Sequence, residues 1–339
     1  MEAGTLSLIM VDGAKLTPLE MRALMNEMLG ELWVASVIAL TDHLGEELSI
    51  RYMRPRMKVN MHEGWHYWKE RLKLDDDPLS ILAYLMHIGS RAGGLVSKAE
   101  MSEWGVALTV YECTVGRPDR EIFCKLHALA FDCLCEAMDP EYVDRHVKWL
   151  TRGDPVCQHL AIRRTLSSDK WFDSGGVIML LTEPSVSMEQ LLEVGSWHVS
   201  SQWMIVVQAL VDAVGSELAL SILRPEMNKR GRAAGRRLLC ILNIDQDTKG
   251  ALENVVAFLH ELMQQPTEGR LTKDGYEERV ASCPFEDASD EVHVLFDAYI
   301  EGVCQAVEPG CVLTVERSAL ERGVCKWRLE RSRHALPGP

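Results

Sequence analysis

Residues 111–159 read YECTVGRPDREIFCKLHALAFDCLCEAMDPEYVDRHVKWLTRGDPVCQH and contain five of the ten cysteines and three of the eleven histidines of the 339-residue chain. The segment 119–138 has the apolar spacing of a helix. Beyond it, 142–150 and 156–162 are joined by the turn Arg152-Gly153-Asp154-Pro155, which predicts a β-hairpin. A helix followed by an antiparallel hairpin is typical of the α+β class, and we expect that class here.

The same organisation recurs further along the chain. GEELSIRYMRPRM at 45–57 aligns without a gap on GSELALSILRPEM at 215–227, at an offset of 170 residues. The downstream pairs are Cys113 with Cys283, Cys135 with Cys304, Pro140 with Pro309, and Cys157 with Cys325. Such a collinear series predicts an internal repeat.

We therefore predict an N-terminal repeat over 1–165 that carries the site, a connector over 166–186, and a degenerate C-terminal repeat over 187–339. Each repeat is expected to have a helical first part followed by an antiparallel β-hairpin or sheet.

Local signals mark the ends of several helices. Thr17-Pro18-Leu19-Glu20 and Ser187-Met188-Glu189-Gln190 have the pattern of a capping box. Asp75-Asp76-Asp77-Pro78 predicts a turn before the next helix. A helix that starts near Glu46 is expected to be interrupted at Arg54-Pro55, with a separate helix following it.

Composition limits the classes of function. A hydrophobic content of 47% with 25% charged residues is ordinary for a soluble globular protein, and 339 residues suffice for two cores. The formal charge of −14 opposes binding to nucleic acid, which needs a basic surface. The N-terminus lacks the features of a secretory signal, and the apolar runs singled out are too short to span a bilayer.

Cysteine usage then indicates the compartment and the partners. Ten cysteines without a secretory signal indicate a reducing cytoplasm, with free thiols or metal ligands in place of a disulfide framework. The expected partner is a small-molecule ligand, without nucleic acid or membrane, and a homodimer is left open. Walker, Gly-x-Gly-x-x-Gly and Gly-x-Ser-x-Gly motifs are absent from the sequence, which disfavours a nucleotide cofactor.

Three interpretations of the cysteine-rich stretch stay open. Cys124 and His127 lie on one helical face, and Cys113 and Cys157 would complete a tetrahedral site for zinc, or for iron. Alternatively Cys124, His127 and Cys157 are catalytic, with His127 drawing a proton from a thiol that attacks an amidine carbon. In the third interpretation the cysteines are small buried hydrophobes and the histidine is a core residue.

A second pattern, His62-Glu63-Gly64-Trp65-His66, matches the zinc-protease motif H-E-x-x-H. The extension of the metzincins is absent and the second repeat lacks the histidines, so a protease is not expected. Exposed polar residues on a helix are the preferred interpretation, and residues lining a ligand pocket are the alternative. The full set of candidate substrate-binding residues is His62, Glu63, His66, Arg145, Asp154 and His159.

The cysteine pattern resembles the L-2-amino-thiazoline-4-carboxylic acid hydrolase-like family and, more distantly, the vinyl reductase-type small-molecule-binding domains. The matching features are a cysteine before a helix, a thiol and an imidazole on it, a proline at its end, an arginine in the next strand and a closing Gly-Asp-x-x-Cys. In this sequence they are Cys113, Cys124, His127, Pro140, Arg145 and Gly153-Asp154-x-x-Cys157.

The resemblance implies a small-molecule hydrolase, or a related lyase, that acts on a C–N or C–S bond such as that of a cyclic amidine or thiazoline. The alternative is a non-catalytic sensor that binds a small molecule or a metal. The second repeat has His293 in place of Cys124 and Phe296 in place of His127, so the first repeat is expected to carry the site.

Overall fold

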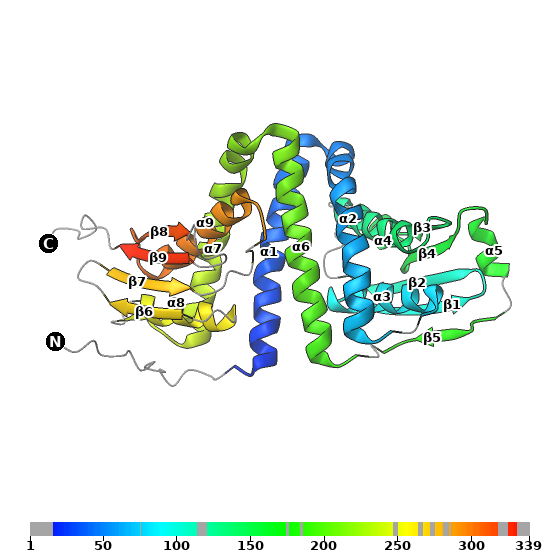
Figure 1. Ribbon diagram of the computed structural model, residues 1–339, viewed down its shortest axis with the longest axis horizontal. Helices are drawn as coiled ribbons and strands as arrows, with labels where there is room; N and C mark the ends of the chain where they lie inside the picture. The colour runs from blue at the N-terminus through cyan, green and yellow to red at the C-terminus, as the bar shows by residue number, and fades with distance from the viewer. Residues whose placement is uncertain are drawn as a thin grey trace. The chain divides into compact units, whose positions relative to one another are not determined.

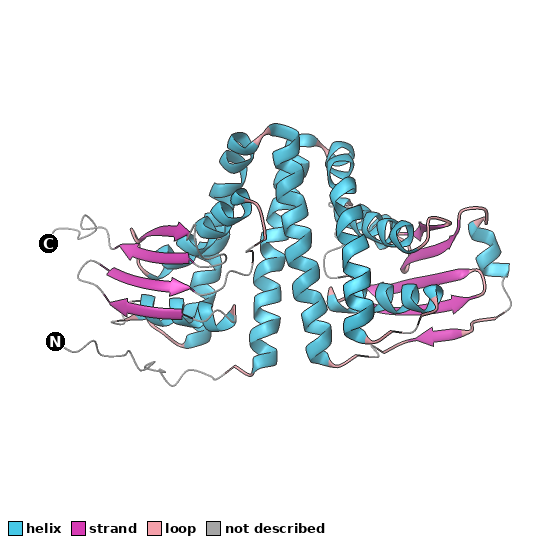
Figure 2. Ribbon diagram, in the orientation of Figure 1, coloured by secondary structure: helices cyan, strands magenta, loops and turns pink. Residues whose placement is uncertain are grey.

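The chain is an α+β protein with antiparallel sheets, as Figure 2 shows in a computed structural model. The structure describes residues 16–74, 76–113, 121–173, 176–183, 186–246, 250–263, 267–271, 275–280, 285, 287–317 and 325–330. It divides into two compact units. Unit 1 comprises residues 1–39 and 214–339, and unit 2 comprises residues 40–213.

Unit 2 contains most of the chain's first half and one long helix from the second. Its elements are α2 (Glu46–Leu72), α3 (Pro78–Ala92), β1 (Val96–Ser102), β2 (Gly105–Glu112), α4 (Ile122–Met138), β3 (Tyr142–Lys148), η1 (Leu150–Arg152), β4 (Cys157–Arg163), α5 (Ser168–Asp173), β5 (Met179–Leu181) and α6 (Met188–Val214). The strands form one antiparallel sheet in the order β3-β4-β2-β1-β5. Helices α3 and α4 contact this sheet, and α2 packs against α4 (Figure 1).

Unit 1 combines the first long helix with the C-terminal elements. These are α1 (Pro18–Leu44), α7 (Ser216–Leu242), α8 (Ala251–Leu262), β6 (Thr267–Leu271), β7 (Gly275–Val280), α9 (Asp290–Val307), β8 (Val312–Arg317) and β9 (Cys325–Glu330). The sheet has the order β6-β7-β9-β8 and is antiparallel throughout. Helices α7 and α9 pack closely, and α9 also contacts β8.

The compact units do not follow the predicted boundaries at residues 165 and 187. Most of α1 belongs to the unit of the C-terminal elements, and nearly all of α6 belongs to the unit of the N-terminal elements. In each unit, ion pairs join this long helix to another helix of the same unit. Arg237 of α7 binds Glu27 and Glu31 of α1, and Arg71 of α2 binds Glu193 of α6.

The capping signals read from the sequence are confirmed. Glu20 accepts a hydrogen bond from the Thr17 backbone N–H at 2.7 Å, while the Glu20 N–H donates back to Thr17 Oγ1 at 3.3 Å. Ser187 and Gln190 make the same reciprocal pair at the start of α6. Because such pairs satisfy backbone donors that a helix end leaves free, they fix where the helix begins.

The predicted break at Arg54-Pro55 is wrong, because α2 runs without interruption through Pro55. A proline inside a helix removes the hydrogen bond to the carbonyl four residues earlier. Here that carbonyl belongs to Arg51, which is exposed together with Pro55, so water can satisfy it. The buried side chains of Met53 and Met57 on the opposite face hold the helix through this position.

Helix α1 is long and apolar enough to cross a membrane by length and composition alone. Buried core helices of soluble proteins meet the same criterion, and Leu32, Val37 and Leu40 of α1 are almost fully buried.

Candidate functional site

The four predicted metal ligands, Cys113, Cys124, His127 and Cys157, line one cavity in unit 2, of about 320 Å³ with its solvent-open part. His146 and His159 line it as well. Helix α4 presents Cys124 and His127 on one face, and the β3–β4 hairpin supplies the remaining imidazoles and Cys157. His146 lies directly opposite His159 in the strand register. The predicted hairpin is thus the element that brings the distant histidines to the helix.

The pKa values of the Cys124 and Cys157 thiols are shifted in opposite directions. The Cys157 thiol donates to Cys124 and lowers the pKa of Cys124 to about 6, with further help from the Thr151 hydroxyl, 3.6 Å from Cys124 Sγ. The same interaction, together with burial, raises the pKa of Cys157 far above the ordinary thiol range. The Leu150 backbone N–H donates to Cys157 Sγ at 3.2 Å. The shared hydrogen bond therefore favours ionisation of Cys124 over ionisation of Cys157.

The rings of His159, His146 and Trp149 stack one on another, starting at this cavity. His159 Nδ1 lies 2.9 Å from Asp144 Oδ2, and both side chains are almost fully buried. The His159 ring stacks on His146 at 4.0 Å, and His146 stacks on Trp149 at 3.6 Å. Burial, and then the neighbouring His159, lower the pKa of His146 to about 2. Both the stacking and the carboxylate fix the orientation of His159.

Within the described ranges, no three His, Cys, Asp or Glu side chains converge as metal ligands do. The zinc or iron site predicted from Cys113, Cys124, His127 and Cys157 stays a prediction. All four side chains line the cavity and are of the kinds that bind zinc, so metal analysis can test it.

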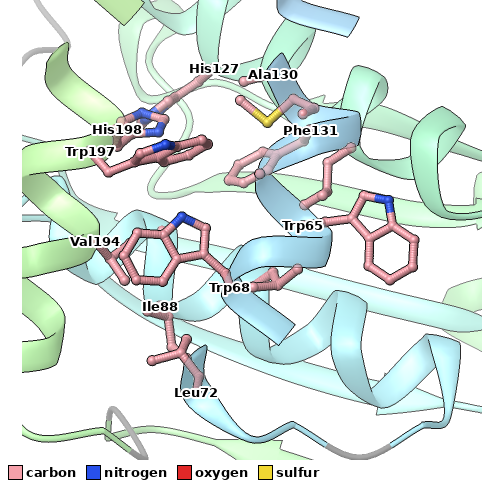
Figure 3. A pocket seen from close by; sticks show the side chains of 15 residues that line it. Trp65, Trp68, Leu72, Ile88, His127, Ala130, Phe131, Val194, Trp197 and His198 are labelled. Carbon is pink, nitrogen blue, oxygen red and sulfur yellow. The ribbon is translucent and has the colours of Figure 1, made fainter. Parts of the chain in front are cut away.

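A second and larger hollow, of about 640 Å³ with its solvent-open part, adjoins the first through His127, which lines both. Helices α2, α3, α4 and α6 form its walls. The lining residues are Met61, Gly64, Trp65, Trp68, Leu72, Leu85, Ile88, Gly89, His127, Ala130, Phe131, Leu134, Val194, Trp197 and His198. Figure 3 shows His127 and His198 together at one end and Trp68, Ile88 and Leu72 towards the other.

The two histidines give this hollow its polar end. Burial is the main cause that lowers the pKa of His127 to about 3 and that of His198 to about 4, so both imidazoles are neutral at pH 7. Neither ring makes a hydrogen bond to any residue in the described part of the chain. Both keep some accessible surface, and both line the hollow. Their ring nitrogens are therefore free for a ligand.

Gly64 allows α6 to approach α2 at the wall of the hollow. A Cβ at this position would lie 2.3 Å from Cη2 of Trp197. The Trp197 ring also meets Trp68 edge to face, at 5.8 Å between centroids. Gly64 of the His-Glu-Gly-Trp-His segment is thus a packing residue, although glycine lowers the helix propensity of α2 at that point.

The remaining predicted substrate-binding residues lie away from both spaces. His62, Glu63 and His66 are exposed on the face of α2 opposite the buried Gly64 and Trp68, as the preferred interpretation of the motif expected. Arg145 and Asp154 serve the hairpin itself. Arg145 donates to the Arg164 carbonyl at 3.3 Å, and Asp154 accepts from the Trp149 N–H at 2.7 Å. Of the six, His159 alone lines one of the two spaces.

Sequence reasoning missed Trp197, His198 and Asp144. Asp144 precedes Arg145 in the predicted strand, and its pairing with His159 follows only from the strand register. Trp197 and His198 lie on α6, in the predicted second repeat, so nothing in the linear sequence connects them to Cys124. Their only sequence signal is the helical spacing from Val194, which also lines the hollow.

Comparisons of the chain with protein-family models, curated proteins and solved structures find no match.

Proposed function

We propose that unit 2 binds a small molecule in the tryptophan-lined hollow and exposes it to the cysteine–histidine cavity behind His127. The observation that carries this proposal is that His127 lines both spaces, so that an apolar pocket lies next to a thiol whose pKa is lowered. Apolar concave sites with a few convergent polar groups are the usual form of small-molecule sites.

Tryptophan fluorescence tests the binding proposal, because Trp65, Trp68 and Trp197 line the hollow. Small aromatic compounds should quench the emission saturably in the wild-type protein. Filling the wall with Ala130→Phe should weaken that binding at least tenfold. Leu313→Phe, in a strand of unit 1, is the matched control and should leave it unchanged. Identical titrations for Ala130→Phe and the wild type would contradict the assignment.

A second candidate function is hydrolysis of a C–N or C–S bond, which the lowered pKa of the Cys124 thiol favours. The sulfur would bond to the carbon of a cyclic amidine or thiazoline. The ring bond to nitrogen or sulfur would break, and the leaving atom would take up a proton. Water would then displace the cysteine and release the product. A thiol with a low pKa is the usual nucleophile of such chemistry.

Alkylation with iodoacetamide at pH 7 tests this second candidate. Cys124 should react faster than Cys133 and Cys135, whose buried thiols have raised pKa values. The exposed Cys240 serves as an internal reference in the same sample. Metal analysis accompanies it, because a zinc or iron equivalent lost in Cys124→Ala and Cys157→Ala would favour the metal interpretation. A metal-free protein with an inert Cys124 would exclude both.

We also propose that the two halves descend from one duplicated segment. The order α1-α2-α3-β1-β2-α4-β3-β4 recurs as α6-α7-α8-β6-β7-α9-β8-β9, and the strand order β3-β4-β2-β1 recurs as β8-β9-β7-β6. Caps recur as well, with Gly45 and Gly215 at positive φ before α2 and α7, and Lys73 and Asn243 left-handed after them. Cys283 lies outside the described residues. Failure of residues 46–163 to superpose on 216–330 in a crystal structure would contradict the duplication.

A further inference from the structure

We infer that the ligand of the tryptophan-lined hollow is an uncharged planar ring with one polar group that both donates and accepts a hydrogen bond. It enters with that group towards His127 and His198. This inference rests on the proposed binding function and names the chemical class of the ligand.

The planar shape of the ligand follows from the side chains that form the walls of the hollow. Trp68 and Trp197 meet edge to face, and Phe131 lies on the wall formed by α4 (Figure 3). Aromatic rings bind other rings by offset stacking and edge contacts, which add to the energy of burying apolar area. Apart from the indole N–H groups and the two histidines, the lining has no polar side-chain atom, because its other side chains are Met, Leu, Ile, Val and Ala. A flat apolar body therefore matches most of the surface.

The polar end requires a ligand group that both donates and accepts. A neutral imidazole has one N–H donor and one acceptor nitrogen, so two such rings offer both kinds of partner. No carboxylate lines the hollow to stabilise an imidazolium there, and neither ring is hydrogen-bonded to a described residue, so the nitrogens of both rings are available to the ligand. A carboxylate can only accept and an amidinium can only donate, whereas a carboxamide does both.

Charge on the ligand is excluded by the lining. No Lys, Arg, Asp or Glu is present among the described residues that form the hollow. Moving an ionised group from water into such a site without a partner is costly, by several kcal/mol per ion in proteins. The site therefore disfavours a thiazoline that carries a carboxylate. The same chemistry favours neutral rings.

Four monosubstituted benzenes test this inference: benzamide, benzoate, benzamidinium and toluene, titrated into the full chain at pH 7 by calorimetry and tryptophan fluorescence. Benzamide should bind most tightly. Toluene should bind about fivefold more weakly, because it lacks the hydrogen bonds. Benzoate and benzamidinium should each bind more than about tenfold more weakly than benzamide.

Two variants locate the polar end. His127→Phe and His198→Phe should each reduce the preference for benzamide over toluene while retaining toluene binding. The exposed His43→Phe is the control and should keep the wild-type preference. Benzoate or benzamidinium binding as tightly as benzamide overturns the inference, in the wild-type protein alone and without any variant. If none of the four probes binds, the proposed binding function itself fails.

Discussion

At position 64 a hydrogen atom stands where any other residue would place a carbon 2.3 Å from the Trp197 ring. We predict that Gly64→Ala displaces Trp197 and disturbs the hollow, because the ring is also held against Trp68. Overpacking of this kind costs about 1–3 kcal/mol of stability, which outweighs the gain of about 1 kcal/mol in helix propensity. Urea denaturation and tryptophan emission measure the two effects.

Gly30 supplies the control for that substitution. It lies inside α1, and a Cβ there would meet nothing within 4 Å. Gly30→Ala should therefore leave the hollow unchanged and raise the free energy of unfolding by up to about 1 kcal/mol. Equal stability changes for the two substitutions would refute the contact between Gly64 and Trp197.

His198 gives the protein a stability that depends on pH. Its pKa falls from 6.5 to about 4 on burial, so between these values the unfolded state takes up a proton that the folded state does not. The free energy of unfolding should consequently decline as pH is lowered from 6.5 to 4, by up to about 3 kcal/mol from this residue. His127 and His146 act in the same direction.

Denaturation at pH 7, 6 and 5 measures this dependence. His198→Gln should lose less stability than the wild type over that range, whereas His43→Gln, at an exposed position, should behave as the wild type. A parallel pH dependence for His198→Gln and the wild type would show that folding does not lower the pKa of His198.

At the scale of elements, the packing of α7 against α9 depends on three glycines. A Cβ at Gly231 would lie 1.9 Å from the Tyr299 carbonyl oxygen, and one at Gly302 would lie 2.1 Å from the Asn228 carbonyl oxygen. Gly235 is similarly close to Val303. Because the obstacles are backbone atoms, a methyl group can be accommodated only if the helices separate.

We predict that Gly231→Ala destabilises unit 1 by about 3 kcal/mol or somewhat more, at the upper end of overpacking effects. Thermal unfolding followed by circular dichroism measures the loss. Binding of aromatic probes to unit 2 is the internal control, because the substituted residue belongs to unit 1. A Gly231→Ala protein as stable as the wild type would contradict the close approach of α7 and α9.

Elements also show where sequence patterns are ambiguous. The capping residues at Thr17 and Ser187 located helix starts correctly, because a cap is a local hydrogen bond. The rule that a proline interrupts a helix failed at Pro55. Whether the helix breaks depends on whether the carbonyl that loses its hydrogen-bond donor is exposed to water. Solvent exposure of Arg51 is a tertiary property that the local sequence does not contain.

At the scale of the whole molecule, one ligand site is proposed and it belongs to unit 2. We predict that benzamide slows amide hydrogen exchange in α2, α4 and α6, whose residues line the hollow. Exchange in α7 and α9 of unit 1 should not change. Mass spectrometry of peptides from these helices measures both. If amide exchange slowed only in α7 and α9, the ligand would bind to unit 1 and the prediction would be wrong.

The sequence by itself determined the α+β class, the hairpin that follows α4, and the gathering of Cys113, Cys124, His127 and Cys157. These follow from periodicity, turn residues and spacing within one short segment, where local interactions dominate.

Only the tertiary structure decided that α6 brings Trp197 and His198 to the hollow, and that Asp144 meets His159. It also showed that His62, Glu63 and His66 are exposed to solvent. Arg145 and Asp154 hydrogen-bond to backbone groups in and next to the hairpin. The physical reason is that the burial of a long helix depends on apolar partners that lie more than a hundred residues away. A linear pattern records which face of α6 is apolar, but not which helices cover that face.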